Sequence, residues 1–190
     1  MKKIIAALAI VTMMASSASA LSFTWKATQI ASEGTKLKSD TAVSAYLVYL
    51  SSGSYASTYA VSPETTAASL AGNIGTSVAS ASKTSALSAL SAEFSFDYGT
   101  YKNGDVFGML LAYEKDGKTY LNLSSETYTL SGISSETSTI DAAQFAFSYS
   151  GPTESSTVKS GGGWTAAVPE PSTAALALAG LALLIKRRRA

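Results

Sequence analysis

Hydrophobic and polar residues alternate over much of the middle of the chain, which is the pattern of β-strands that bury one face. The alternating stretches are residues 21–26, 94–98, 128–130 and 143–149. Residues 46–50 are apolar throughout and are followed by two serines and a glycine, so we expect a strand that is covered on both faces. The pattern predicts a mainly β domain, arranged as a β-sandwich.

The strongest local signal is Asp116-Gly117, which lies between the apolar stretches 106–114 and 119–124. This dipeptide favours a two-residue hairpin loop of type I′. Such a loop fixes the register of its strands. The expected pairs are Tyr113 with Tyr120, Ala112 with Leu121, and Leu110 with Leu123. We expect the aliphatic members of these pairs on one face of the hairpin and the tyrosines on the other.

Residues 62–90 carry a different pattern, which predicts one or two short helices inserted in the β domain. Ser62 is placed to cap the first helix, with Pro63 at its first position. Residues 83–91 are a candidate for the second helix. The same Ala/Ser-rich stretch is also compatible with a loosely ordered insertion.

The first twenty residues have the organisation of a secretory signal peptide. Lys2 and Lys3 form a basic start, residues 4–14 are apolar, and Ala18-Ser19-Ala20 matches the small-residue cleavage rule. We therefore expect residues 1–20 to be removed and Leu21 to begin the mature chain. The alternative is an uncleaved N-terminal anchor.

Gly151-Pro152 is expected to end the folded body, which would span residues 21–151. The following residues are rich in serine and glycine, including three consecutive glycines at 161–163. This composition predicts a flexible linker over residues 152–167.

The last part of the chain combines three features, beginning with Pro169-Glu170-Pro171, where the prolines favour an extended backbone. Residues 174–185 are apolar and uncharged on every side, which predicts a single transmembrane helix. A membrane stop signal follows, formed by Lys186, Arg187, Arg188 and Arg189. A full span takes about 20 apolar residues, so a buried C-terminal helix is the alternative.

This order of proline-glutamate-proline triplet, short apolar helix and arginine cluster resembles the PEP-CTERM protein-sorting signal of Gram-negative bacteria. Pro169, Glu170 and Pro171 match its triplet, and the three arginines match its basic end. The resemblance is confined to residues 168–190. It implies recognition by exosortase, an integral-membrane processing enzyme. It also implies temporary anchoring in the inner membrane, delivery to the envelope, the surface or the medium, and a frequent association with exopolysaccharide production.

Composition narrows the chemistry of the body. The formal net charge of the chain is +1, but much of the positive charge lies in the two targeting segments. The remainder is mildly acidic and lacks a basic stripe, which argues against nucleic acid as a partner. The chain contains no His and no Cys, so it lacks Ser-His-Asp and Cys-His nucleophile sets and the usual zinc ligands. We expect no cofactor and no metal site.

Paired carboxylates are the remaining candidates for catalysis, in the manner of glycoside hydrolases. The nearest pairs are Glu93 with Asp97 and Glu114 with Asp116, and the second pair flanks the expected hairpin turn. Turn and edge positions explain these residues better than catalysis does. Asp97, Asn103 and Asp105 have oxygens for calcium, but their spacing differs from an EF-hand loop and favours a turn over residues 102–105.

The body is rich in aromatic residues, most of which are expected in the core. An exposed subset on a sheet face would suit stacking against sugars. The candidates are Trp25, Tyr46, Tyr49, Tyr55, Tyr59, Tyr98, Tyr101, Tyr113 and Tyr120. We therefore expect a non-enzymatic envelope or surface protein with a structural, adhesive or matrix role linked to exopolysaccharide. The alternatives are a carbohydrate-binding module and a carboxylate-based carbohydrate-active enzyme.

Overall fold

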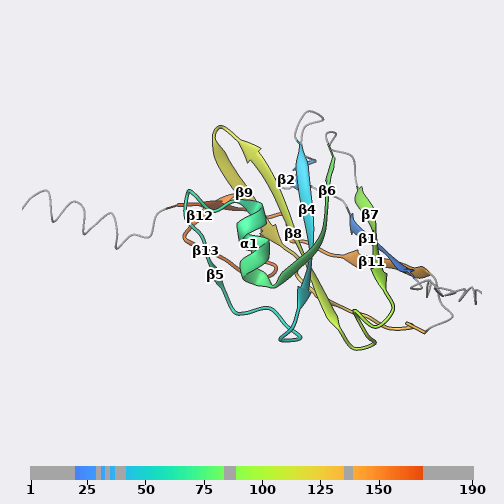
Figure 1. The fold of residues 1–190 in the computed structure, drawn as a ribbon. Helices are drawn as coiled ribbons and strands as arrows, with labels where there is room; N and C mark the ends of the chain where they lie inside the picture. The colour runs from blue at the N-terminus through green and yellow to red at the C-terminus, as the bar shows by residue number, and fades with distance from the viewer. Residues whose placement is uncertain are drawn as a thin grey trace, which may run out of the picture.

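A computed structural model of the chain describes residues 20–28, 31–32, 35–36, 42–83, 89–134 and 139–168. This part of the protein is mainly β, with one short helix (Figure 1). The smaller sheet has the strand order β11 (Thr139–Phe145), β1 (Ala20–Thr28), β7 (Ala89–Asp97). Its central strand β1 is parallel to β11 and antiparallel to β7.

The larger sheet is built around two long neighbouring strands, β4 and β8. Its strand order is β12 (Thr153–Ser155), β14 (Thr165–Ala167), β9 (Lys118–Leu123), β8 (Val106–Lys115), β4 (Val43–Leu50), β6 (Thr76–Lys83), and β10 (Tyr128–Thr129) also pairs with β8. Two small ribbons complete the sheets: β5 (Tyr59–Ala60) with β13 (Thr157–Val158), and β2 (Ala31–Ser32) with β3 (Thr35–Lys36).

The main core is formed by buried side chains from both sheets. Strand β1 buries Leu21, Phe23 and Trp25, as its alternation predicts, and the larger sheet contributes Leu47 and Met109 from β4 and β8. The prediction of a mainly β fold is thus confirmed, and the alternation of residues 21–26 places Leu21, Phe23 and Trp25 in the core. The alternation of residues 94–98 does so only in part, since Phe96 is buried but Tyr98 is exposed.

Helix α1 (Ala67–Ile74) lies beside the larger sheet (Figure 1), and it packs on a second apolar cluster on the opposite face of that sheet. Leu70 and Ile74 of the helix belong to this cluster together with Val48 of β4 and Leu110 of β8. Strand β4 is therefore buried on both faces, as residues 46–50 predict. The cluster therefore packs α1 against β4 and β8.

The β8–β9 hairpin has the predicted register. Asp116 and Gly117 both have positive φ angles, of 52° and 71°, as a type I′ loop requires. Leu110, Ala112, Leu121 and Leu123 lie in the cluster under α1, whereas Tyr113 and Tyr120 pack on the main core. The two faces of the hairpin are therefore divided as the sequence predicts.

The helix begins one turn later than predicted. Thr66, not Ser62, is its N-cap: the Ser69 amide donates to Thr66 Oγ1 over 3.1 Å, and the Thr66 amide donates to Ser69 Oγ over 3.1 Å. Ser62 instead closes a turn, since its carbonyl accepts a hydrogen bond from the Thr65 amide over 2.9 Å. The prediction that Ser62 caps a helix is wrong because the reciprocal pair available to Thr66 satisfies two amides at once.

The second predicted helix is also wrong. Lys83 belongs to β6 and residues 89–91 belong to β7, on either side of residues 84–88, which lie outside the described part. Strand β6 places Ala79 and Ala81 against the main core, opposite Leu47 and Ala45 of β4. Alternating alanine and serine give no apolar positions at helical spacing. The conformation of β6 is therefore set by its pairing with β4.

The linker predicted for residues 152–167 is the largest error. This stretch contains β12, β13 and β14, and its Trp164 is fully buried in the main core. One large aromatic side chain and the main-chain pairing of β14 outweigh the serine- and glycine-rich composition. The folded body therefore continues to Val168.

The predicted signal peptide and the predicted transmembrane helix over residues 174–185 lie outside the described residues, apart from Ala20 at the start of β1. Within the described ranges, no helix is both long and apolar enough to cross a membrane.

Candidate functional site

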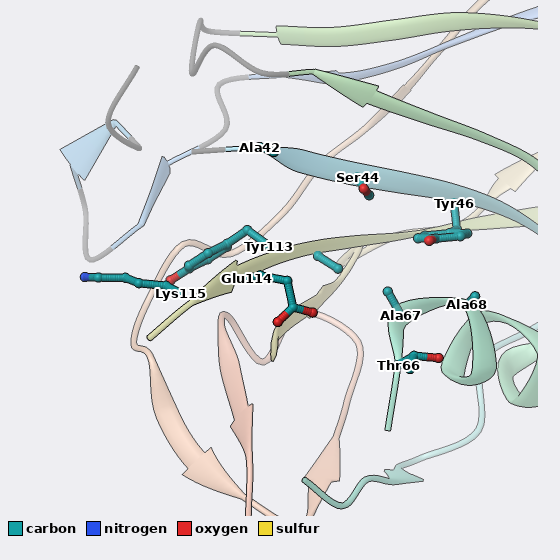
Figure 2. Close-up of a pocket in the computed structure, with 10 residues that line it drawn as sticks. Ala42, Ser44, Tyr46, Thr66, Ala67, Ala68, Tyr113, Glu114 and Lys115 are labelled. Atoms are coloured by element: carbon teal, nitrogen blue, oxygen red, sulfur yellow. The ribbon is translucent and has the colours of Figure 1, made fainter. Parts of the chain in front are cut away.

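A groove of about 670 Å³ lies between the larger sheet and the start of α1 (Figure 2). Tyr46 and Glu114 are on the sheet side of the groove, and Thr66 and Ala67 face them from the helix side. The complete lining is Ala42, Ser44, Tyr46, Thr66, Ala67, Ala68, Ala112, Tyr113, Glu114 and Lys115.

The groove exists because α1 covers only part of its sheet face. The helix packs over Val48 and Leu110. Further along the same face, Ser44 lies opposite Ala112 of β8, and these small side chains leave space beside the helix start. The half-buried ring of Tyr46 stands between the covered and the open part of the face.

A row of hydroxyl groups runs along this face. Ser44 and Ser82 are opposite each other on β4 and β6, with their Oγ atoms 2.8 Å apart. Ser80 is opposite Tyr46 in the same pair of strands. Thr66 adds a hydroxyl from the helix side. Sequence reasoning missed this row, although Ser80 and Ser82, two positions apart in residues 76–83, are a signal for it.

Glu114 supplies the acidic group of the groove. Its side chain is exposed and accepts a hydrogen bond from Thr119 Oγ1 over 2.8 Å at Oε1. This contact orients the carboxylate and leaves its other oxygen available. Asp116, the predicted partner of Glu114, is at the hairpin loop and is not among the residues that line the groove.

The other candidate carboxylates are placed apart. Glu93 and Asp97 are exposed residues of β7, and their four-residue separation along a strand corresponds to about 13 Å. Paired carboxylates of glycoside hydrolases are about 5–9.5 Å apart. Neither residue lines the groove. The geometry of β7 therefore does not suit the pair for glycoside hydrolysis.

The residues considered for calcium have structural roles. The Asp105 amide donates to the Lys102 carbonyl over 3.0 Å, which closes the predicted turn, and Asp105 Oδ2 accepts from the Lys102 amide. Asn103 is bonded to Ile133 in both directions, with distances of 3.0 and 2.8 Å. No group of three or more His, Cys, Asp or Glu side chains suited to a metal is present among the described residues.

Most of the candidate aromatic residues are used in packing. Tyr49 and Tyr101 belong to a group of rings around Phe107 at the main core. Tyr113 and Tyr120 stack with their ring centroids 4.7 Å apart and their planes nearly parallel. Tyr46 and Tyr113 are the aromatic candidates among the residues that line the groove, and Tyr46 belongs to the sheet face under α1, whereas Tyr113 packs on the main core. Tyr98 is exposed at a separate turn.

The described body ends at Val168, directly before the predicted sorting triplet. The Val168 amide donates to the Ser155 carbonyl over 3.1 Å. Close by, Lys118 and Glu154 form an exposed ion pair of 2.7 Å. The hydrogen bond within the pair raises the pKa of Lys118 and lowers that of Glu154. Pro169, Glu170, Pro171, Ala18 and the basic cluster Lys186, Arg187, Arg188 and Arg189 lie outside the described residues.

Comparison with known proteins addresses the tail more than the body. No curated protein matches the chain at a significant level. A solved structure of an alternative pilotin from the type II secretion system of Vibrio cholerae has a TM-score of 0.36 and 15% identity, covering 67% of this chain and 97% of that chain. These values are too low to indicate a shared fold. Residues 167–190 match the family described as the PEP-CTERM protein-sorting motif.

The match includes the triplet, the apolar run and the basic end that suggest the resemblance. Such a motif indicates export to the cell envelope or surface and processing by exosortase, a membrane enzyme. The chain is therefore a protein that carries a PEP-CTERM sorting signal at its C-terminal end.

Proposed function

We propose that the protein is a non-enzymatic component of the cell envelope or surface, and that its body binds saccharide chains in the groove beside α1. The role is structural or adhesive, in a matrix linked to exopolysaccharide. In this proposal residues 174–185 hold the precursor in the inner membrane, with Pro169-Glu170-Pro171 outside and the basic cluster inside. Exosortase then removes the tail near the triplet.

The observation that carries the proposal is the combination of the Tyr46 ring, the Ser44 and Thr66 hydroxyls and the Glu114 carboxylate around one groove. A sugar ring presents an apolar face, which an aromatic ring can cover, and a rim of hydroxyl groups. Serine and threonine hydroxyls both donate and accept hydrogen bonds, and the carboxylate accepts them. The site therefore matches the chemistry of a saccharide.

The charge of the groove favours neutral saccharides. Glu114 projects into the groove and repels a uronate or sulfate placed beside it. The lining contains one cation, Lys115, which extends away from the groove in Figure 2. We expect neutral chains to bind more tightly than acidic chains of similar length.

Two observations support a binding role over a catalytic one. The sequence lacks His and Cys, which removes the common nucleophile and base combinations. Glu114 is the single carboxylate among the residues that line the groove, whereas glycoside hydrolysis uses a pair. A lone carboxylate can accept hydrogen bonds from a bound sugar but has no second group to complete the acid-base pair.

Binding of purified exported protein to an array of neutral and acidic polysaccharides would test the proposal. We expect Tyr46→Ala to weaken binding at least tenfold and Tyr46→Phe to preserve it, because the ring face makes the contact. Tyr98→Ala is the matched control, since Tyr98 is an exposed ring outside the groove. Equal binding by wild type and Tyr46→Ala would contradict the proposal. Saccharide hydrolysis that is lost in Glu114→Gln would support the enzyme alternative instead.

A further inference from the structure

The folded body leaves almost no spare chain before the sorting triplet. Strand β14 ends at Ala167, and Val168 is still hydrogen-bonded to Ser155 of β12. Pro169 is the next residue. β14 is also an interior strand, since it pairs with β9 on one side and with β12 on the other.

Trp164 fixes the point at which this final segment joins the body. Its ring is fully buried, and its main chain is bonded in both directions: the amide donates to the Ser150 carbonyl and the carbonyl accepts from the Thr153 amide, each over 2.9 Å. Beyond it, residues 165–168 carry side chains no larger than threonine and valine. The segment after Trp164 is therefore the part that can separate from the sheet with the least loss of buried apolar surface.

The membrane brings the body close to the processing enzyme. Six residue steps connect Val168 with Ala174, where the apolar run begins. Even when fully extended, they span about 20 Å. The closeness of the body to the enzyme rests on the proposed function, in which residues 174–185 anchor the precursor in the membrane. An enzyme that acts on the triplet within this gap meets the body at β12, β14 and the β8–β9 loop.

An enzyme that reads a peptide in extended form uses main-chain hydrogen bonds along several residues. The main chain of residues 165–168 is already committed to β9 and β12. The same groups cannot pair with the body and with an enzyme together. We propose that β14 is a conformational part of the sorting signal: exosortase binds residues 165–168 together with the triplet, and processing requires this segment to leave the sheet.

The proposal makes the rate of processing depend on how often β14 opens. When opening and closing are fast, cleavage of a locally opened segment follows the population of the open form. Pairing of β14 with β9 involves two residue pairs and pairing with β12 involves three, so opening requires far less than global unfolding.

A reversible disulfide can test this dependence. Ser155 and Ala167 are opposite each other in the parallel β12–β14 pair, and both are partly exposed. Neighbouring strands are about 4.8 Å apart, within the range for a disulfide. The chain has no native cysteine, so the full-length Ser155→Cys/Ala167→Cys variant has one possible intramolecular bond. The matched control is Ser22→Cys/Ser95→Cys, which joins β1 to β7 in the other sheet.

The assay mixes oxidised full-length protein with membranes that contain exosortase and follows removal of the tail by mass spectrometry. We expect the 155–167 bond to slow processing at least tenfold, reduction to restore it, and the 22–95 bond to have no effect. Insertion of eight Gly/Ser residues between Val168 and Pro169 should make the locked protein processable again, because the added chain replaces β14 as the extended segment. Equal processing of the locked and reduced forms without the insertion would overturn the proposal.

Hydrogen exchange of the same full-length protein gives a second test that does not depend on the enzyme. We expect the amides of Ala166 and Val168 to exchange much faster than amides of β8, because they exchange by local opening. Exchange of β14 as slow as that of β8 would overturn the proposal even if anchoring and processing take place. Failure of every variant, including the wild type, to be retained or processed would overturn the proposed function and this proposal with it, whereas processing that is equal in the locked and reduced forms would overturn this proposal alone.

Discussion

The indole of Trp164 meets the ring of Tyr113 edge to face, with the ring centroids 4.7 Å apart and the ring planes at 76°. Tyr113 in turn stacks on Tyr120, its partner across the β8–β9 hairpin. Trp164 comes from the serine- and glycine-rich stretch near the end of the body. Through this contact the segment that leads into β14 packs against β8 of the larger sheet.

Replacement of Trp164 by Ala should therefore destabilise the whole body. Truncation of a fully buried aromatic side chain costs about 3–5 kcal/mol, a large share of the stability of a typical domain. Urea unfolding followed by circular dichroism measures the effect. Tyr98→Ala is the control and should change stability by less than about 0.5 kcal/mol, because its ring is half exposed. Similar midpoints for the two variants would mean that Trp164 is not a core residue.

A second prediction concerns the hairpin loop. Gly117 has a φ angle of 71°, and a Cβ added there meets no atom within 4 Å, so any penalty is conformational. Gly117→Val should cost about 1–3 kcal/mol, because a β-branched residue resists positive φ. Gly72 of α1 has equally open surroundings but lies in a helix, so Gly72→Ala should stabilise the protein by about 0.5–1 kcal/mol. Thermal melting should show these opposite signs, and a shared sign would contradict the loop geometry.

A third prediction concerns alkaline pH. Burial raises the pKa of Tyr55 to about 12. Its hydroxyl accepts a hydrogen bond from the Met109 amide over 2.9 Å and is also bonded to Ser124 Oγ. Because the folded pKa is raised above the ordinary value, the unfolded chain loses this proton first as the pH rises above 10. The associated stability is complete below pH 10 and decreases as the pH approaches 12, by up to about 2–3 kcal/mol.

Urea midpoints at pH 9, 10 and 11 measure this decrease. Tyr55→Phe should make the decrease shallower, although it removes the nearer of the two hydrogen-bond acceptors of the Met109 amide and lowers stability at pH 9. The decrease should not vanish, because burial also raises the pKa of Tyr101 and Tyr149. Tyr98→Phe serves as the control and should follow the wild type. A Tyr55→Phe curve parallel to that of the wild type would refute the assignment.

The sequence predicts elements whose signal is local. Strict alternation places Leu21, Phe23 and Trp25 in the core, and Asp116-Gly117 fixes the register of the hairpin. The errors occur where distant pairing decides the structure. Residues 76–83 form a strand because β4 pairs with them, and β14 forms because β9 and β12 lie on either side. The composition of a segment does not indicate which distant strands pair with it.

Only part of the candidate groove could be predicted from the sequence. Tyr46 and Glu114 are both residues that the sequence singles out, one for stacking and the other for its charge. Their meeting with Thr66 depends on where α1 begins, which the predicted cap at Ser62 misplaces by one turn. The pairing of Ser44 with Ser82 depends on β6, which the sequence suggests as part of a helical region. A site assembled from three separate elements needs their packing, and no single stretch encodes it.

The last prediction separates anchoring from recognition in the sorting signal. The apolar run of residues 174–185 is short for a membrane span, so retention should depend strongly on the basic cluster. Changing Arg187, Arg188 and Arg189 to Ser should therefore release unprocessed protein from the membrane fraction. Glu170 precedes the apolar run, and Glu170→Ala should leave insertion intact but block processing, so that full-length protein accumulates in the membrane. Fractionation with C-terminal mass analysis distinguishes the two outcomes. If both variants behave as the wild type does, the stretch from 168 to 190 does not act as a sorting signal in this protein.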